Sequence, residues 1–355
     1  MNEAAQEQFN KLLASKADAV YRYMVLDHTG NWAMDMNAWD WVPGVGAASI
    51  LTYYKATGNE AVKYQLLDWV DRNKSKAFQV RVVNSMAPFA IFPDLHRLTG
   101  ERLYLDQAIE IADWMIEQAP RAGEGAFEHT FTEDDASYPK QIWADTIYMA
   151  VLFLSRIAAL TGNKTYAYEA LHQLDVHFKA LQDPETGVLY HGWDTVNRNH
   201  MSGAKWARAN AWVALAAPLI IEQVRDVVSV PQEIFDAYGK LMRGLIGFRA
   251  ADGLWHTVLD RPDFYKEASG SAGIAAGLYH GVRIGCLEPT AADGNQLTLQ
   301  SLISLINLSG AVRQVSTGTP VMPTLEAYNR IELTPTLYGQ GLMLELLSAY
   351  LPGQQ

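Results

Sequence analysis

A repeated pattern of paired helices constrains the fold of this chain more than any other feature of its sequence. Three segments each place Thr-Gly between two stretches whose apolar residues recur every three or four positions, at Thr57-Gly58, Thr99-Gly100 and Thr161-Gly162. This spacing is typical of amphipathic helices, and a glycine directly after a helix readily takes the left-handed conformation that ends it. The three segments therefore predict helical hairpins.

A second element repeats along with the helical pairs. It consists of a glycine-containing turn, then apolar or aromatic residues, then a histidine, in GEGAFEHT, ETGVLYHGWD and ADGLWHTVLD. The histidines are His129, His191 and His256. An element that recurs after successive helix pairs puts equivalent loops on equivalent sides, as in a solenoid or a closed toroid. Because 355 residues offer about twelve helices, we expect an all-α (α/α)6 barrel of six hairpins, with residues 1–355 as a single domain.

Composition and charge exclude several classes of protein. Hydrophobic residues make up 49% of the chain and charged residues 19%, which favours a large core over disorder. The formal net charge is -11 and no run of Lys or Arg is present, so we expect no nucleic-acid partner. The longest apolar stretch, AWVALAAPLII, is well short of the roughly 20 residues that a membrane span needs and contains Pro218, so no membrane partner is expected.

The N-terminal stretch and the single cysteine favour a cytoplasmic location. The first residues are charged and amphipathic, without the continuous apolar region and cleavage site of a signal peptide. Cys286 has no second cysteine with which to form an internal disulfide. No H-E-x-x-H helix, cysteine pair or dense carboxylate loop predicts a metal site. We expect a monomer or weak homo-oligomer that needs neither a metal nor another cofactor.

Several tryptophans fall near the predicted loops rather than in the apolar stripes of the helices. They are Trp32, Trp39, Trp41, Trp193 and Trp206. The C–H faces of sugar rings stack on aromatic side chains, so aromatic residues around the mouth of a barrel suit a carbohydrate ligand.

One acidic residue interrupts the most informative stretch, YPKQIWADTIYMAVLFLSRIAALTG, residues 138–162. Apolar residues cover most faces of this stretch, as expected of an inner helix of the barrel, and Asp145 is the only acid between Tyr138 and Arg156. Burial of a carboxylate is costly unless the group is paired or functional. From these residues alone, Asp145 could equally favour the positive end of a helix or accept a neighbour's hydrogen bond.

Three ordered blocks carry a family resemblance. YPKQIWADTIYMAVLFL, LQDPETGVLYHGWD and KWARANAW resemble the unsaturated rhamnogalacturonyl hydrolases, glycoside hydrolase family 105, which are related to the unsaturated glucuronyl hydrolases of family 88. The segment WDWVPGV fits the start of the family, and SGSAGIAAGLYHG and YGQGLMLELL are similar to its C-terminal part. The similarity covers at least residues 39–212, and several blocks in order are more specific than one motif.

The resemblance implies an enzyme that removes a 4,5-unsaturated uronic acid from the nonreducing end of a lyase-generated oligosaccharide of the pectin or rhamnogalacturonan type. The expected partner is thus an anionic oligosaccharide. Asp145 would protonate C4 of the double bond and then act as the base for the water that adds at C5. The resulting hemiketal opens and expels the aglycone, so one carboxylate suffices where ordinary glycosidases use two.

The resemblance also implies residues that bind the substrate. His191 would contact the sugar, Arg208 would pair with its carboxylate, and Trp206 and Trp212 would stack on its ring. Trp41, in the N-terminal block, is a further candidate. Each also has a structural alternative: Arg208 as a surface charge, for example, or Trp212 as part of the core.

The chain departs from the family at several of these positions. Ala209 and Ala211 replace two glycines of the family's W-A-R-G-N-G-W run, which alters backbone freedom there. Asn84 stands where members often carry an aspartate, and it can bind a hydroxyl group but cannot accept a proton. A His-Lys pair that some members carry ahead of the YP block is not matched, which leaves His129 and Lys140 as nearby candidates for substrate binding.

Three other functions are compatible with the sequence. A sugar epimerase on the same barrel would use histidines as acid and base, drawn from His129, His191 and His256. A conventional inverting glycosidase would pair Asp145 with a second acid such as Asp194. A helical toroid without catalytic activity could bind an oligosaccharide.

Overall fold

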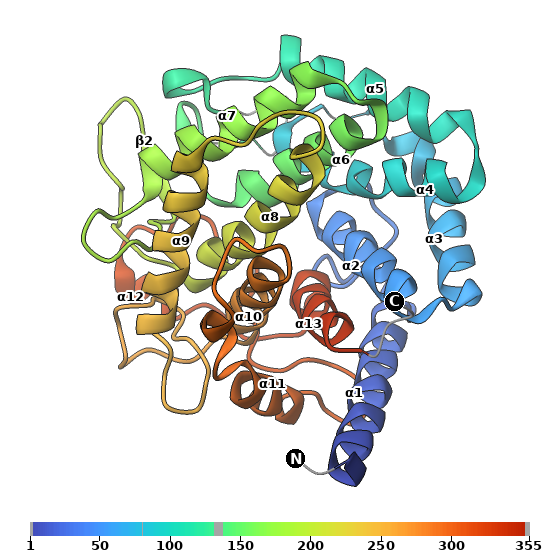
Figure 1. The fold of residues 1–355 in the computed structure, drawn as a ribbon, viewed down its shortest axis with the longest axis vertical. Helices are drawn as coiled ribbons and strands as arrows, with labels where there is room; N and C mark the ends of the chain where they lie inside the picture. Colours follow the sequence, from blue (N-terminus) through green and yellow to red (C-terminus); the bar gives the residue numbers. More distant parts are fainter. Residues whose placement is uncertain (1–2, 80, 131–137, 352–355) are drawn as a thin grey trace.

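The computed structural model of the protein describes residues 3–79, 81–130 and 138–351. Figure 1 shows α2, α8, α10 and α13 around a common centre, with the remaining long helices outside them. The outer helices are α1 (Glu3–Met24), α3 (Glu60–Asn73), α5 (Arg102–Glu117), α7 (Lys164–Leu181), α9 (Gln232–Gly247) and α11 (Asn295–Ser304). The inner segments are α2 (Trp41–Thr57), η2 with α4 (Val83–Ile91, Phe92–Thr99), η4 with α6 (Ile147–Val151, Leu152–Thr161), α8 (Ala207–Val224), α10 (Ala268–Arg283) and α13 (Leu337–Ala349).

The inner segments form a closed ring. Segment α2 contacts η2, which contacts η4 and α6; α6 contacts α8, α8 contacts α10, and α10 contacts α13. The ring closes because α13 packs against α2, and α1 packs against both of them. Outer and inner segments alternate along the chain, so the predicted all-α (α/α)6 barrel is confirmed.

The Thr-Gly motifs end inner helices of the barrel, as predicted. Gly58, Gly100 and Gly162 are the C-caps of α2, α4 and α6, and all three adopt the left-handed conformation with φ of 65°, 74° and 67°. Glycine takes this conformation without the steric cost that a Cβ atom brings. In two of the motifs the next residue, Asn59 or Asn163, then caps the following outer helix with its side chain. All three motifs thus end an inner helix, and in two of them the next residue also caps the following outer helix.

A short antiparallel sheet changes the expectation for residues 138–162. Strand β1 (Gln141–Trp143) pairs with β2 (Gly192–Asp194), with Ile142 opposite Trp193. The inner helix begins only at Asp145, and its segment η4, Ile147–Val151, is π-helical. Ile142 and Trp143 are therefore strand residues rather than helix residues, Ala144 is the turn between strand and helix, and Asp145 is the first residue of the helix.

Buried apolar side chains from α1 through α13 form one continuous cluster. Short connecting elements complete the described chain: η1 (Lys74–Lys76), η3 (Gly123–Gly125), η5 (Pro289–Ala292) and α12 (Leu325–Tyr328). Among the described residues, no helix has the length and apolar character that crossing a bilayer requires.

Candidate active site

One end of the barrel contains a cavity of about 490 Å³. The starts of α2, η2, η4 and α8 reach it, so it collects residues that are distant in the sequence. Its walls are formed by Trp32, Asp40, Trp41, Asn84, His129, Tyr138, Trp143, Asp145, Met149, Trp206, Arg208, Trp212, Thr317, Gly318, Thr319 and Pro320. Aromatic rings with a few polar groups between them are typical of a carbohydrate site.

Most of the predicted site residues meet in this cavity. Seven of the nine line it: Trp41, Asn84, His129, Asp145, Trp206, Arg208 and Trp212. His191 lies directly beside the carboxylate of Asp145, with 3.4 Å between Nε2 and Oδ2. Lys140 is placed elsewhere: its Nζ donates to the carbonyl of Arg121 at 3.0 Å, and its side chain is 56% exposed. The structure thus brings eight of the nine residues together and leaves Lys140 outside.

Asp145 is the buried carboxylate of the cavity, with a side chain only 14% exposed. Burial raises the pKa of this carboxyl, but the close contact with His191, the nearby His129 ring and the charge of Arg208 outweigh burial and hold the pKa below its usual value. The Asp145 carboxyl is therefore ionised in the free protein at neutral pH.

The two histidines beside Asp145 are neutral at physiological pH. Burial lowers the pKa of His129 to about 3, and its ring stacks on Trp143 with centroids 4.3 Å apart. Nδ1 of His129 is 2.9 Å from the hydroxyl of Thr146. Burial also lowers the pKa of His191, although Asp145 opposes the shift. Neither imidazole carries the positive charge that would make it a strong acid at neutral pH.

Two residues of the alternative mechanisms lie outside this cavity. Nδ1 of His256 is 2.7 Å from the carbonyl of Phe264, and His256 belongs to a different surface depression. Asp194 accepts hydrogen bonds from the backbone N–H groups of Val196 and Asn197. The structure thus separates His256 from the other two histidines and Asp194 from Asp145.

Arg208 is the only Lys or Arg among the described residues that line the cavity. It is buried, and its Nη1 lies 3.4 Å from the equally buried carboxylate of Glu267. The guanidinium lies over the rings of Trp206 and Tyr338, at 4.4 Å and 4.7 Å from their centroids. Arg208 is therefore not the plain surface charge that the sequence left open.

Arg208 also holds one wall of the cavity in place. Its Nη1 donates to the carbonyl and hydroxyl oxygens of Ser316 at 2.9 Å and 2.6 Å. Its Nη2 donates to the carbonyl of Thr317 at 2.9 Å and to the hydroxyl of Thr319 at 3.2 Å. Both terminal nitrogens are thus committed to protein acceptors, so this arginine shapes the wall and supplies charge to the cavity at the same time.

Two polar residues face the cavity near the start of the inner ring. Oδ1 of Asn84 is buried and has no hydrogen-bond partner among the described residues, so it is available to a hydroxyl group of a ligand. Asp40 caps α2 and accepts from the N–H of Trp41 at 2.7 Å, and burial raises the pKa of its carboxyl. Asp40 was not among the predicted site residues, although an acid directly before Trp41-Val-Pro is a recognisable helix start.

Ala209 and Ala211, which replace family glycines, do not line the cavity. Both are buried within α8, where a small residue on the neighbouring helix receives one of them: a Cβ at Gly273 of α10 would lie 2.8 Å from the Cβ of Ala211. Ala211 therefore belongs to the packing between α8 and α10, and Ala209 is a further buried residue of α8.

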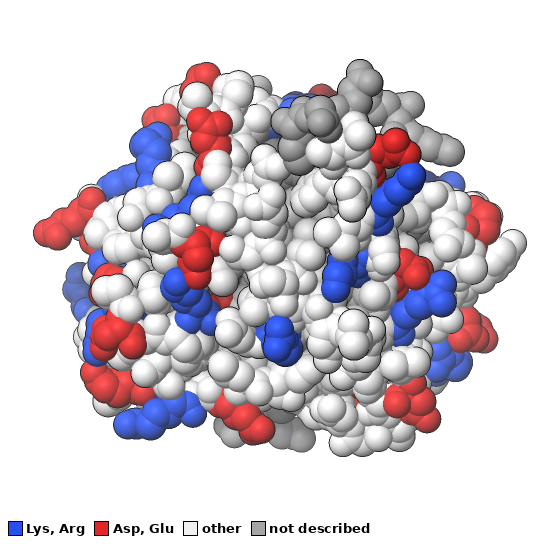
Figure 2. All heavy atoms as spheres, turned by 90° about the horizontal axis from the view of Figure 1, so that it is seen from below, with Lys and Arg blue, Asp and Glu red and all other residues white. Residues whose placement is uncertain are grey.

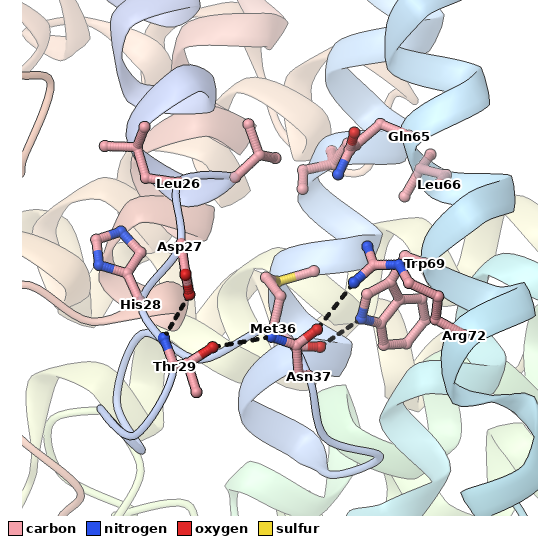
Figure 3. A pocket seen from close by; sticks show the side chains of 12 residues that line it. Leu26, Asp27, His28, Thr29, Met36, Asn37, Gln65, Leu66, Trp69 and Arg72 are labelled. Atoms are coloured by element: carbon pink, nitrogen blue, oxygen red, sulfur yellow. Dashed lines mark hydrogen bonds between the residues drawn. The ribbon is translucent and has the colours of Figure 1, made fainter.

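A second cavity, of about 290 Å³, lies between the end of α1 and helices α2 and α3 (Figure 3). Its polar groups bond to one another: Arg72 donates to Oδ1 of Asn37 at 2.8 Å, and Nε1 of Trp69 donates to the carbonyl of Met36 at 2.6 Å. Trp69 also stacks on Trp39, with centroids 5.5 Å apart. Trp32, Asp40 and Trp41 line the larger cavity. The contacts at the smaller cavity hold the chain segment that carries these three residues against α3.

The closed barrel and its aromatic cavity with one buried, ionised acid define a carbohydrate-active enzyme. Residues 16–352 match Glycosyl Hydrolase Family 88, and the chain belongs to this family of glycosidases. It is 35% identical over 316 residues to the unsaturated rhamnogalacturonyl hydrolase YesR of Bacillus subtilis (strain 168), covering 88% of this chain and 89% of that relative.

Solved structures agree with this assignment. A possible member of the GH105 family from Klebsiella pneumoniae has a TM-score of 0.89 and 29% identity, covering 99% of this chain and 94% of that one. A possible GH105 member from Salmonella enterica has a TM-score of 0.88 and 30% identity, covering 96% and 93%. The resemblance to family 105 is confirmed by these matches.

Proposed function

We propose that this glycosidase releases a 4,5-unsaturated uronic acid from the nonreducing end of lyase-generated oligosaccharides of the pectin or rhamnogalacturonan type. The name of the Bacillus relative, an unsaturated rhamnogalacturonyl hydrolase, supports this substrate class. The observation that carries the proposal is the position of Asp145, a buried carboxylate beside a neutral histidine in an aromatic cavity. Such an acid can exchange a proton with a ring held against the aromatic walls.

Asp145 performs both proton transfers in the proposed reaction. Its carboxyl group gives a proton to C4, and the positive charge that develops at C5 is stabilised by the ring oxygen. A water molecule adds its oxygen to C5 and returns a proton to Asp145. The hemiketal at C5 then opens to a ketone, and the ring oxygen stays on C1 as part of a hemiacetal. Collapse of that hemiacetal releases the aglycone with its glycosidic oxygen.

The first step requires the protonated form of Asp145, which is the minor form in the free protein at neutral pH. A bound substrate displaces water from the cavity and adds a further carboxylate to it. Both changes raise the pKa of Asp145, because desolvation and a like charge each disfavour the ionised form. Substrate binding therefore helps to load the proton that the reaction uses.

The walls of the cavity provide two binding regions, one for the unsaturated uronate and one for the sugar that follows it. Trp206 and Trp212 are buried around Asp145, where they contact the unsaturated ring, and Asn84 receives one of its hydroxyl groups. Trp32 is 54% exposed at the mouth and forms an edge contact with Trp41 at 6.0 Å. A Cβ at Gly318 would lie 2.9 Å from the Trp32 ring, so the glycine leaves room for the indole there. Trp32 is thus the platform for the sugar that follows the uronate.

Arg208 attracts the carboxylate of the substrate through its charge. It does not form a bidentate pair with that carboxylate, because both of its terminal nitrogens already donate to protein acceptors. Glu267 offsets part of this charge, and Asp40 and Asp145 add negative groups to the cavity. The segment 316–319, which Arg208 positions, supplies hydroxyl groups to the wall. Ordering of this segment is therefore part of substrate binding.

The proposal extends to the setting of the enzyme. We infer a cytoplasmic enzyme, a monomer or weak homo-oligomer, which acts without a metal or nucleic-acid partner. On the face drawn in Figure 2, basic and acidic side chains are interspersed around a largely uncharged centre, without a continuous basic stripe. No cluster of three or more metal-binding side chains occurs in residues 3–79, 81–130 and 138–351, and metal independence stays a prediction.

One assay tests the function. The protein is incubated with unsaturated disaccharides that lyases produce from rhamnogalacturonan, from other pectins and from glycosaminoglycans, and loss of the ultraviolet absorbance of the conjugated alkene is followed. We expect the absorbance to fall when the substrate is the unsaturated disaccharide derived from rhamnogalacturonan. Release of reducing sugar with the alkene intact would instead indicate conventional hydrolysis at C1.

A further inference from the structure

Tyr328 connects to Asp145 through His191. The hydroxyl of Tyr328 is 2.7 Å from Nδ1 of His191, and Nε2 of the same ring faces Oδ2 of Asp145 at 3.4 Å. Tyr328 is fully buried at the end of α12 and lies outside the cavity lining, so it does not reach the substrate space. The three side chains come from three separate parts of the barrel.

The hydrogen-bond partners of the Tyr328 hydroxyl oxygen indicate which group donates in the contact between Tyr328 and His191. The backbone N–H of Met322 donates to that oxygen at 3.1 Å, which occupies one of its acceptor positions. The phenol has a single proton that needs an acceptor, and Nδ1 of His191 lies within hydrogen-bond distance at 2.7 Å, so we take this nitrogen as the acceptor. Nδ1 is then the bare nitrogen, so the ring proton of the neutral imidazole is on Nε2.

The opposite tautomer is disfavoured at both ends of the ring. A proton on Nδ1 would compete with the proton of the Tyr328 hydroxyl, and it would leave the lone pair of Nε2 facing the carboxylate of Asp145. Two electron-rich atoms would then face each other in a buried place without a proton between them. The hydrogen bond from Tyr328 and the charge of Asp145 therefore favour the same tautomer.

We propose that Tyr328 is a positioning residue that fixes His191 as its Nε2-protonated tautomer, so that the imidazole N–H points at the catalytic carboxylate Asp145. The donor holds the carboxylate in one orientation toward the cavity. It also stabilises the ionised form to which Asp145 returns when water has added to the substrate. The tautomer itself follows from the structure alone, whereas its catalytic consequence rests on the proposed function.

The tautomer can be measured without any activity. In protein labelled with ¹⁵N at histidine, the two ring nitrogens of His191 are assigned by their loss in a His191→Asn variant. We expect Nε2 to carry the proton and Nδ1 to give the shift of a bare nitrogen from pH 5 to pH 8. A proton on Nδ1, or a doubly protonated ring in this range, would overturn the proposal.

A Tyr328→Phe variant tests the consequence for catalysis. We expect kcat to fall about 10- to 100-fold with KM nearly unchanged, as when the orienting partner of a functional histidine is lost. Because the N–H of His191, 3.4 Å from Oδ2, favours the ionised carboxylate and lowers the pKa of Asp145, its loss should also move the basic limb of the kcat/KM profile to higher pH. A purely structural tyrosine would not move that limb.

The matched control is Tyr238→Phe. Tyr238 is also fully buried, and its hydroxyl donates to backbone carbonyls of α8 and α10 far along the helices from the cavity. This variant should keep the wild-type kcat and pH profile. A Tyr328→Phe protein with a wild-type melting temperature, kcat and pH profile would refute the positioning role. If the wild-type protein failed to act on unsaturated substrates, the nitrogen shifts would still decide the tautomer.

Discussion

The carboxylate of Asp145 and the imidazole of His191 meet at 3.4 Å because a short sheet aligns the segments that carry them. Trp143 of β1 is opposite Gly192 of β2, and the N–H of Ala144 donates to the carbonyl of His191 at 3.1 Å. The next residue, Asp145, therefore leaves the sheet beside His191. The inner helix begins at Asp145 and continues as the π-helical segment η4, and such segments are frequent at functional sites.

Replacing Asp145 by asparagine should abolish most activity while preserving the fold. The substitution keeps the size of the side chain and removes the transferable proton, so we expect kcat to fall by about 10²- to 10⁴-fold. Loss of alkene absorbance measures the rate, and circular dichroism measures the fold. Asp194→Asn, outside the cavity, is the control and should retain activity. Near-normal turnover by Asp145→Asn would remove this residue from the mechanism.

The sequence predicted the architecture because the relevant signals are local. Thr57-Gly58, Thr99-Gly100 and Thr161-Gly162 end helices through backbone conformations that glycine favours, whatever the tertiary context. The family resemblance then identified Asp145 and most of its neighbours. Lys140 was close in sequence to the site, but its Nζ is bonded to the carbonyl of Arg121, which only the tertiary structure reveals.

Contacts that depend on closure of the helical ring could not be predicted from the sequence. Asp40, Tyr328 and the segment 316–320 reach the site from the two ends of the chain, and they meet it only because α13 packs against α2. The acceptors of Arg208 have the same origin, since Ser316 and Glu267 follow it by many residues. No periodicity or local motif specifies such pairings.

Arg208→Ala should destabilise the protein as well as weaken substrate binding. The change leaves the buried carboxylate of Glu267 without its positively charged partner, although Ser269 and the N–H of Gly270 still donate to it, and we expect a cost of about 3 to 5 kcal/mol in the free energy of unfolding. Denaturant unfolding measures this cost. An added Glu267→Gln change should restore part of the stability without restoring the affinity. An Arg208→Ala protein of wild-type stability would show that the pair does not hold the wall.

Glu345 should make stability depend on pH. It lies buried on α13, where Thr52 donates to it at 2.9 Å, and burial raises its pKa from 4.5 to about 7 despite Thr52, Arg156 and Lys55. Between these two pH values the folded protein holds a proton that the unfolded chain has released. The free energy of unfolding therefore falls as pH rises from about 4.5 to about 7, by about 3 kcal/mol from this group.

Glu345→Gln removes this titration, so the variant should be more stable than the wild type at pH 8 and nearly equal to it at pH 4.5. Thermal unfolding at the two pH values measures the difference. Glu117→Gln, at an exposed position of α5, is the control and should show no such dependence. The same stability difference at both pH values would contradict the role assigned to Glu345.

Trp32→Ala should weaken binding of the second sugar of the substrate without affecting binding of the unsaturated uronate. Loss of the exposed platform should raise KM about 3- to 10-fold for an unsaturated disaccharide, as the stacking contribution of an aromatic ring suggests. A methyl glycoside of the same unsaturated uronate lacks the second sugar and should react normally. Tyr64→Ala, at a position 63% exposed on α3, is the control. Equal losses on both substrates would place Trp32 at the uronate instead.

The destination of solvent atoms tests the central claim, that Asp145 initiates hydration of the double bond. Turnover in heavy water should leave deuterium at C4 of the released sugar, and ¹⁸O from labelled water should enter at C5, while C1 keeps the former ring oxygen. Mass spectrometry of the earliest product, before carbonyl groups exchange with water, locates both labels. The account predicts deuterium at C4 and label at C5 with loss of the alkene; ¹⁸O at C1 with the alkene intact would contradict it.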